Sequence, residues 1–308
     1  MLLDGRIAIV TGAGGGLGRA HALYLASQGA KIVVNDLALA SAERVAGEIR
    51  ACGGDAIAIA GSVSDERAMA DMAANARETW GRVDILVNNA GILRDKSFAK
   101  MSIDDFRAVV DVHLIGAAIC SKAVWEIMRE QRFGRIVMTT SSSGLWGNFG
   151  QANYGAAKMA LVGLMQTLAI EGEKYGIRVN CLAPTAATQM THGVLSEASL
   201  AALDPSLVSP ALLPLVSDDA PSRAILCAGA GHFAASRITL SQGLYLGAGD
   251  HVGPALVARW DKVVDPEGEL APSYGFTQAE RELASAGMID PIVVNMRDSD
   301  GATTLRAL

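Results

Sequence analysis

A glycine-rich turn, TGAGGGLG at residues 11–18, stands between a short apolar run and a helical stretch. The run before it, RIAIVT at residues 6–11, is predicted to be a strand buried on both faces. Glycine tolerates the positive φ angles of a tight turn and lets backbone N–H groups approach a pyrophosphate, at which the following helix directs its dipole. This unit predicts a dinucleotide-binding α/β fold. The turn residues predicted to contact the cofactor are Gly12, Gly16, Leu17 and Gly18.

The alternation of strands and helices continues along the chain. Further strands are predicted near residues 31–36, 55–63, 83–91, 134–142 and 177–184. Helices of roughly 10 to 25 residues separate them, which requires right-handed crossovers and a parallel sheet covered on both faces.

The alternation weakens after Pro184. Residues 188–222 are predicted to form short helices and loops that cover the substrate, and residues 238–249 to form a last strand. We expect one domain over residues 1–250, with residues 251–308 as a C-terminal extension packed on that domain. Half of the 308 residues are hydrophobic, so a large core is available.

Charge and cysteine content exclude several classes of function. The net charge is −6 and no lysine or arginine cluster occurs, which argues against nucleic acid as a partner. The four cysteines are far apart without a CxxC pair, so neither disulfides nor a metal site are expected. No signal peptide and no apolar run of about 18 residues is evident, and we therefore expect a cytoplasmic protein without a membrane span.

Asp36 ends the second predicted strand, 18 residues after Gly18. This spacing is typical of a carboxylate that holds the adenosine ribose hydroxyls of a dinucleotide. A 2′-phosphate there would face a like charge, and Gly15 leaves no basic side chain within the turn to neutralise it. Both features favour NAD over NADP. The alternative is that Asp36 merely caps a turn.

Tyr154 and Lys158 are four residues apart on a predicted helix and therefore share a face. A free tyrosine has a pKa near ~10, but an ammonium group about 4 Å away contributes about 4 kcal/mol at an effective dielectric near 20. The spacing thus predicts that Lys158 brings the pKa of Tyr154 to about 7, which suits a general acid and base. Ser141 follows the fifth strand, at the sheet edge where ligands bind, and could hydrogen-bond a substrate oxygen.

The turn TGAGGGLG, the segment NNAG at 88–91, Ser141 and the segment YGAAK at 154–158 resemble the short-chain dehydrogenase/reductase family in order and spacing, over about residues 3–190. The resemblance implies a Rossmann-like, doubly wound sheet of seven parallel strands and hydride transfer at a carbinol or ketone. It implies Tyr154 as acid and base, Lys158 on the nicotinamide ribose and Ser141 orienting the substrate. Further cofactor residues by the same match are Ser62, Val63, Asn89, Gly91 and Thr188, and further substrate residues are Phe149 and Gln151.

A narrower resemblance concerns the stretches GNFGQANYGAAK and LAIEGEKYGIRVN. They are similar to the (3R)-hydroxyacyl-CoA dehydrogenase units of type 2 multifunctional enzymes, which implies NAD-dependent oxidation of a (3R)-3-hydroxyacyl-CoA. Alternatives are a hydroxysteroid or sterol side-chain dehydrogenase, a 3-oxoacyl carrier-protein reductase and a non-catalytic NAD-binding module. His113 stands where many family members carry an asparagine, and a structural role for it is at least as well supported as a catalytic one.

Two long predicted helices, residues 102–131 and 151–175, carry apolar stripes. The family packs such helices against a second subunit, which implies a homodimer or homotetramer. The alternative is that both stripes face the sheet. Small and apolar residues in 148–151 and 188–222 favour a hydrophobic acyl-CoA or sterol-like substrate.

Overall fold

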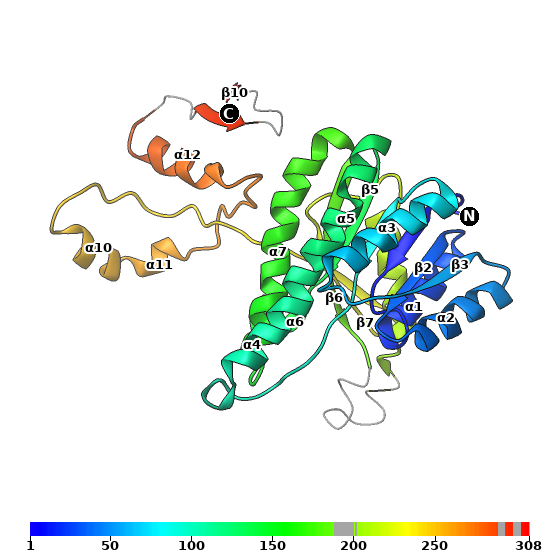
Figure 1. Ribbon diagram of the computed structural model, residues 1–308. Helices are drawn as coiled ribbons and strands as arrows, with labels where there is room; N and C mark the ends of the chain where they lie inside the picture. Colours follow the sequence, from blue (N-terminus) through cyan, green and yellow to red (C-terminus); the bar gives the residue numbers. More distant parts are fainter. Residues whose placement is uncertain (188–199, 201, 289–292, 298–302, 308) are drawn as a thin grey trace. The chain divides into compact units, whose positions relative to one another are not determined.

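The computed structural model describes residues 1–187, 200, 202–288, 293–297 and 303–307 (Figure 1). An eight-stranded sheet in the order β3-β2-β1-β4-β5-β6-β7-β8 forms its centre. The strands are β1 (Ile7–Val10), β2 (Lys31–Asp36), β3 (Ala56–Ala60), β4 (Ile85–Asn88), β5 (Gly134–Thr139), β6 (Ile177–Thr185), β7 (Ile225–Gly229) and β8 (His232–Ser236). The first seven are parallel and β8 runs antiparallel to β7. The expected Rossmann-like sheet of seven parallel strands is thus present, with one additional antiparallel strand.

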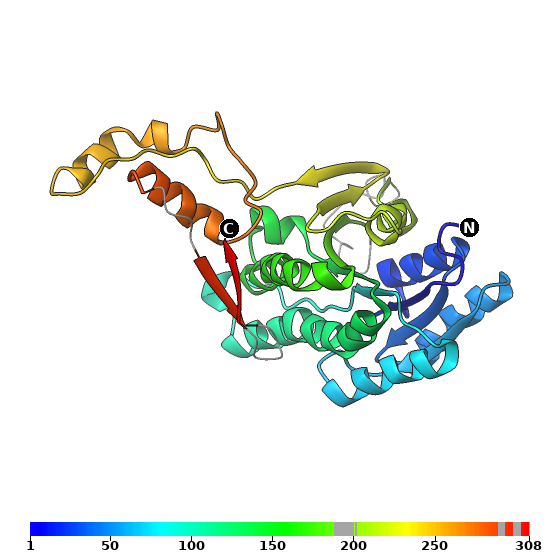
Figure 2. The ribbon, with the colours of Figure 1, turned by 90° about the horizontal axis from the view of Figure 1, so that it is seen from above.

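Helices cover both faces of the sheet (Figures 1 and 2). Helices α1, α2 and α9 share one core cluster with the sheet, and helices α3, α5 and α7 share the other. The helices of this part are α1 (Gly16–Ser27), α2 (Leu39–Ala51), α3 (Glu66–Trp80), α4 (Ile103–Val110), α5 (Gly116–Gln131), α6 (Ser142–Trp146), α7 (Ala152–Gly172) and α9 (Leu212–Val216). Short 3-10 helices are η1 (Phe98–Lys100), η3 (Glu173–Tyr175), η4 (Pro205–Leu207) and η5 (Ser209–Ala211), and η2 (Asp111–Ile115) is a π-helical turn.

Strand β1 shows why the central strands are apolar at every position. Ala8 and Val10 belong to the core cluster on the α1 side, whereas Ile9 belongs to the cluster on the α5 side. All three side chains are fully buried because successive residues of a strand point to opposite faces. The periodicity in the sequence therefore predicted this layer arrangement correctly.

The predicted strand at residues 238–249 is wrong. The last strands of the eight-stranded sheet are β7 and β8, which form a hairpin through Ala230 and Gly231. Both turn residues have positive φ angles, 50° and 75°, as a tight two-residue hairpin turn requires. The pairing of β7 with β6 fixes this hairpin, whereas residues 238–249 contribute a single bridge, between Leu240 and Leu270.

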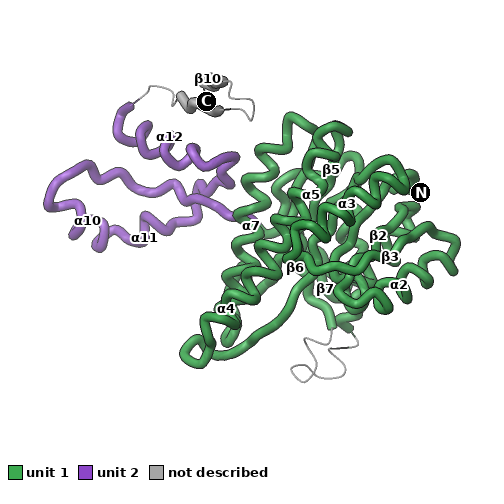
Figure 3. Tube along the Cα trace, viewed as in Figure 1, with its two compact units in different colours: residues 1–236 green, residues 237–308 purple. Residues whose placement is uncertain are grey.

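The chain divides into two compact units, residues 1–236 and 237–308, which Figure 3 colours separately. The second unit contains α10 (Val252–Ala258), α11 (Trp260–Val263), α12 (Phe276–Ser285) and an antiparallel pair, β9 (Val293–Arg297) and β10 (Thr303–Ala307). That residues 251–308 pack on the first domain stays a prediction. So does the role of 188–222 in covering the substrate, because part of that segment lies outside the described residues.

In the part of the chain that the structure describes, one helical stretch, Ile103–Gln131, is long and apolar enough to cross a membrane by length and composition. It comprises α4, η2 and α5, and α5 contributes Cys120, Val124 and Met128 to the buried core. Because the core helices of globular domains pass the same test, this stretch is weak evidence for a membrane span.

His21 connects α1 to the segment that precedes α9. Its side chain is completely buried, and Nδ1 lies 2.9 Å from Oγ of Ser209 in η5. Burial lowers the pKa of His21 to about 3, whereas an unfolded histidine has a pKa near ~6.5. The unfolded chain therefore binds more protons below pH ~6.5, so the stability contributed by the neutral ring is complete above that pH and is lost as pH falls towards 3.

We expect the variant His21→Gln to lose less stability in acid than the native protein. Between pH 7 and pH 4.5 the titration of His21 should account for about 2 to 3 kcal/mol of the fall in unfolding free energy. Urea unfolding at the two pH values measures this loss, with the exposed His232→Gln as the matched control. Equal losses in the native protein and in His21→Gln would contradict the prediction.

Candidate active site

The glycine turn lies between the end of β1 and the start of α1. Gly12 and Gly16 have positive φ angles of 61° and 50°, which favour glycine at both positions. A Cβ atom at Gly18 would lie 2.3 Å from the carbonyl oxygen of Gly12, so only glycine fits. No side chain caps α1 at Gly15, and the first N–H groups of the helix have no intrahelical partner. The turn therefore has the features that a dinucleotide pyrophosphate requires.

Asp36, at the end of β2, lies against this turn as predicted. Its Oδ2 accepts a hydrogen bond from the backbone N–H of Gly14 at 2.9 Å, and its Oδ1 accepts one from the N–H of Ala38. Sequence reasoning missed a basic neighbour, since Arg44 reaches the turn from α2 and donates from Nη2 to the carbonyl oxygen of Gly14 at 2.6 Å. Because Arg44 is on a different element, its spacing from the turn carried no signal.

The end of β4 supplies the other wall of the dinucleotide region. Asn89 donates from Nδ2 to the carbonyl oxygens of Thr11 and Gly12, at 2.9 and 3.3 Å. Thr11 Oγ1 accepts hydrogen bonds from the N–H groups of Asn89 and Ala90. These bonds lock the NNAG segment to the glycine turn. After β3, Val63 is buried and lines a small cavity with Thr11, whereas the hydroxyl of Ser62 accepts from the N–H of Ser64.

The structure brings Ser141, Tyr154 and Lys158 together beside this region. Ser141 caps the N-terminus of α6 directly after β5, and its Oγ accepts from the N–H of Ser143 at 3.2 Å. Tyr154 lies in the first turn of α7 and its phenol is hydrogen-bonded to the side chain of Ser141. One turn later, Lys158 is buried with its Nζ atom 5.4 Å from the centroid of the Tyr154 ring. The three side chains form one site although they come from two elements.

The pKa of Tyr154 shifts in the direction opposite to the one expected from the sequence. Burial raises the pKa of Tyr154, the hydrogen bond with Ser141 opposes this, and the Asp95 carboxylate raises the pKa further. The expectation that Lys158 lowers the pKa of Tyr154 to about 7 is therefore wrong in direction. The physical reason is that Lys158 Nζ donates to the carbonyl oxygen of Thr139 at 2.5 Å instead of pointing at the phenol oxygen, and burial lowers its own pKa to about 7.

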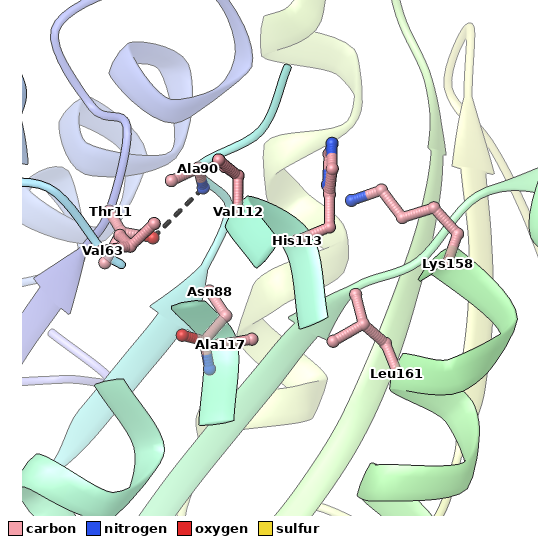
Figure 4. A pocket seen from close by; sticks show the side chains of 9 residues that line it. All are labelled: Thr11, Val63, Asn88, Ala90, Val112, His113, Ala117, Lys158 and Leu161. Carbon is pink, nitrogen blue, oxygen red and sulfur yellow. Dashed lines mark hydrogen bonds between the residues drawn. The ribbon is translucent and has the colours of Figure 1, made fainter. Parts of the chain in front are cut away.

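His113 lies on the π-helical turn η2 and packs edge-on against Tyr154, with ring centroids 5.2 Å apart. Its Nε2 lies 2.8 Å from the carbonyl oxygen and 3.0 Å from the nitrogen of Ile92, and burial lowers the pKa of the ring to about 3. A Cβ atom at Gly91 would lie 2.2 Å from this ring, which explains the glycine. His113 is thus neutral near pH 7. In Figure 4 its ring and Lys158 line one cavity.

The predicted substrate residues differ in their surroundings. Phe149 is 90% exposed, at the turn between α6 and α7. Gln151 has its amide occupied, because Nε2 donates to Asp95 and Oε1 accepts from Ser143 and Asn148. Thr188 lies outside the described residues. Among the described residues, no group of three or more histidine, cysteine, aspartate or glutamate side chains could hold a metal ion.

A parallel sheet with a glycine turn after β1, a serine after β5, and a tyrosine and a lysine in the first two turns of α7 defines a nicotinamide-dependent oxidoreductase of the Rossmann class. Residues 6–198 match the model of the short chain dehydrogenase family. The chain belongs to this family, whose members use NAD or NADP.

The chain is also similar to individual proteins of this family. The chain is 43% identical over 303 residues to a peroxisomal hydratase-dehydrogenase-epimerase of Neurospora crassa, a match that covers 94% of this chain and 33% of that protein. The chain thus spans about a third of the length of that relative. It is 44% identical over 273 residues to a putative short-chain type dehydrogenase/reductase of Mycobacterium tuberculosis, covering 85% and 95% of the two chains. A 3-oxoacyl-[acyl-carrier-protein] reductase of Synechocystis is 42% identical over 197 residues, covering 63% and 80%.

Solved structures agree with this placement. The full-length peroxisomal multifunctional enzyme type 2 of Drosophila melanogaster superposes with a TM-score of 0.79 at 36% identity, covering 93% of this chain and 50% of that one. A 7α-hydroxysteroid dehydrogenase complexed with NADH and 7-oxo glycochenodeoxycholic acid gives a TM-score of 0.69 at 32% identity, covering 74% and 94%.

Proposed function

We propose that the protein oxidises a secondary alcohol with NAD, and that its substrate is a (3R)-3-hydroxyacyl-CoA, which becomes the 3-oxoacyl-CoA. The observation that carries this proposal is the grouping of Ser141, Tyr154 and Lys158 beside the glycine turn. The substrate class is supported by relatives named as hydratase-dehydrogenase-epimerase and multifunctional enzyme type 2. Trp146, which ends α6, and Phe149, in the turn between α6 and α7, are exposed and provide apolar surface beside the site.

In this mechanism the Ser141 hydroxyl orients the substrate oxygen towards Tyr154, and the deprotonated oxygen of Tyr154, the phenolate, takes the hydroxyl proton and becomes the neutral phenol. NAD, when bound, would supply the acceptor for the hydride of the carbinol carbon. Lys158 would bind the nicotinamide ribose. Its buried amine stands close enough to Tyr154 to favour the phenolate once it leaves the Thr139 carbonyl. Ketone reduction reverses the roles, with the protonated phenol as the acid.

The other predicted cofactor residues would contact different parts of NAD, according to the element that carries them. The glycine turn and Asn89 would hold the pyrophosphate side, and Ser62 and Val63 the adenine. Asp36 would hold the adenosine ribose, where its charge disfavours a 2′-phosphate. Arg44, which is hydrogen-bonded to the same turn, would favour a 2′-phosphate, but its guanidinium is also 3.0 Å from the carboxylate of Glu48. We therefore propose NAD as the preferred cofactor.

Initial rates test both the proposed substrate and the proposed cofactor. We expect NADH production with (3R)-hydroxyacyl-CoA to exceed that with the (3S) isomer and with a 17β-hydroxysteroid by at least about tenfold, and NAD to exceed NADP similarly, a difference of ~1.4 kcal/mol. Faster oxidation of the steroid would favour the second candidate, which rests on the likeness to 7α-hydroxysteroid dehydrogenase. Faster NADPH-dependent reduction of a 3-oxoacyl carrier protein would favour the third, which rests on the likeness to the Synechocystis reductase.

The assembly and location are also proposals. Several apolar side chains on the long helices are exposed, as expected for helices that pack against a second subunit in a homodimer or homotetramer; they are Ile103, Ile115, Met159 and Ile170. The names of the fungal and animal relatives place those proteins in the peroxisome, which conflicts with the expected cytoplasmic location. We propose that the protein resides in one of these two compartments, which fractionation of its source cells would distinguish.

A further inference from the structure

Asp95 lies in the loop that follows β4 and is the first member of a chain of hydrogen bonds between side chains and one backbone N–H group. Its Oδ2 accepts from Nε2 of Gln151 at 2.7 Å. Oε1 of Gln151 accepts from the hydroxyl of Ser143 at 2.8 Å. The N–H of Ser143 donates to Oγ of Ser141, the serine bonded to Tyr154. The chain therefore links an exposed carboxylate to the turn that positions the reacting groups.

The basic residues on either side of Asp95 in the sequence pair with another acid. Lys96 Nζ lies 2.8 Å from Asp105 Oδ2, and Arg94 Nε lies 4.0 Å from Asp105 Oδ1. Over the described ranges of the chain, no ion pair involves Asp95, and its hydrogen-bond partner there is the neutral amide of Gln151. The negative charge of Asp95 is thus compensated by no direct contact with a cation in those ranges.

Among the described residues, three side chains lie against Tyr154, and the charge of Asp95 acts on it as well. Ser141, from the turn after β5, is neutral and hydrogen-bonds the phenol. His113, from η2, is neutral near pH 7, because burial lowers its pKa to about 3. Lys158, on the same helix, has a pKa lowered to about 7 and donates to the Thr139 carbonyl oxygen. Asp95 contributes a negative charge, and it acts against the phenolate.

We infer that Asp95 is a positioning residue that governs the reaction from outside the Ser141–Tyr154–Lys158 set. Its hydrogen bond holds Gln151 and, through Ser143, the turn that carries Ser141, while its negative charge adds to the burial of the ring in disfavouring the Tyr154 phenolate. The inference rests on the proposed function, because it concerns the group that exchanges the substrate proton. It gives Gln151 a supporting role in place of direct substrate contact. A protonated Tyr154 suits ketone reduction and moves alcohol oxidation to higher pH.

The variant Asp95→Asn separates charge from hydrogen bonding, because asparagine can still accept from Gln151. We expect the acidic limb of kcat/KM for alcohol oxidation to move roughly 0.5 to 1 pH unit towards acid, because the variant removes a negative charge that disfavours the phenolate. High salt should shift the native profile in the same direction and the variant profile less, because at 1 M the Debye length is only about 3 Å. A profile that coincides with the native one would overturn the inference.

Asp104→Asn is the matched control. It removes the same charge from a carboxylate that is 92% exposed and pairs with Arg107, away from Gln151. We expect its pH profile to coincide with that of the native protein. A shift as large as that of Asp95→Asn would show that net charge alone is responsible and would overturn the inference.

Gln151→Ala tests whether Asp95 positions Ser141 through hydrogen bonds. The variant keeps the Asp95 carboxylate but removes the side chain that connects it to Ser143. We expect kcat/KM to fall roughly tenfold, because Ser141 loses its support, while the pH midpoint stays in place. Native turnover in this variant would overturn the positional role.

Tyr154→Phe in the same assay distinguishes failure of the proposed function from failure of the inference about Asp95. If it retains native turnover, the proposed function fails. If it is inactive while Asp95→Asn behaves as the native protein, this inference alone fails.

Discussion

Replacing Tyr154 by phenylalanine should lower kcat/KM for alcohol oxidation by roughly 10² to 10⁴-fold, the range that general acid–base catalysis contributes. The substitution removes one oxygen, the atom that hydrogen-bonds Ser141 and would take the substrate proton. The ring remains in place against His113, so the fold and the dinucleotide region should be undisturbed. Initial rates of NADH formation measure the effect, and NADH fluorescence titration should show a dissociation constant within about threefold of the native value, less than ~1 kcal/mol.

Tyr175→Phe provides the matched control for this change. Tyr175 lies in η3, directly after α7, and its hydroxyl accepts a hydrogen bond from Arg129 at 3.0 Å. Tyr175→Phe also removes one phenol oxygen, but that oxygen has no contact with the site. The turnover of this variant should therefore equal that of the native protein. If Tyr154→Phe were equally active, the protein would be a dinucleotide-binding module whose chemistry, if any, resides elsewhere.

Gly18→Ala should be the most damaging single methyl group in the dinucleotide region. The new Cβ would lie 2.3 Å from the carbonyl oxygen of Gly12 and 2.5 Å from Nδ2 of Asn89. The oxygen belongs to the backbone, so relief requires α1 to move away from the turn. Overpacking of this kind costs about 1 to 3 kcal/mol of stability. We also expect NAD to bind at least about tenfold more weakly, a loss of ~1.4 kcal/mol.

Thermal unfolding and NADH titration measure the two effects of Gly18→Ala. Gly47→Ala in α2 is the control, because its Cβ would meet no atom within 4 Å. A methyl group there should leave cofactor affinity unchanged and stabilise the helix by roughly 0.5 to 1 kcal/mol. Native affinity in Gly18→Ala would show that the close packing of α1 on the turn is not required for the dinucleotide.

Much of the fold and the membership of the site could be predicted from local patterns. The apolar run of β1, the glycines of the turn and the acid ending β2 are close in sequence, and their spacing reflects one strand–turn–helix unit. Ser141 was identified because it follows a strand whose carboxyl end lies at the ligand-binding edge of a parallel sheet, and Tyr154 because its spacing from Lys158 puts both on one helix face. The hairpin of β7 and β8 was missed because the pairing with β6 selects those residues, and periodicity in a short segment does not reveal pairing.

The sequence by itself therefore determined that helices cover both faces of a parallel sheet and that Ser141 follows a strand at its carboxyl edge, because both follow from periodicity and chain direction. Only the tertiary structure decided how those residues interact. It aimed the Lys158 amine at Thr139, brought Arg44 to the glycine turn and placed Asp95 against Gln151. Electrostatic and hydrogen-bonding effects depend on distances of a few Å between separate elements, and no spacing along the chain encodes those distances.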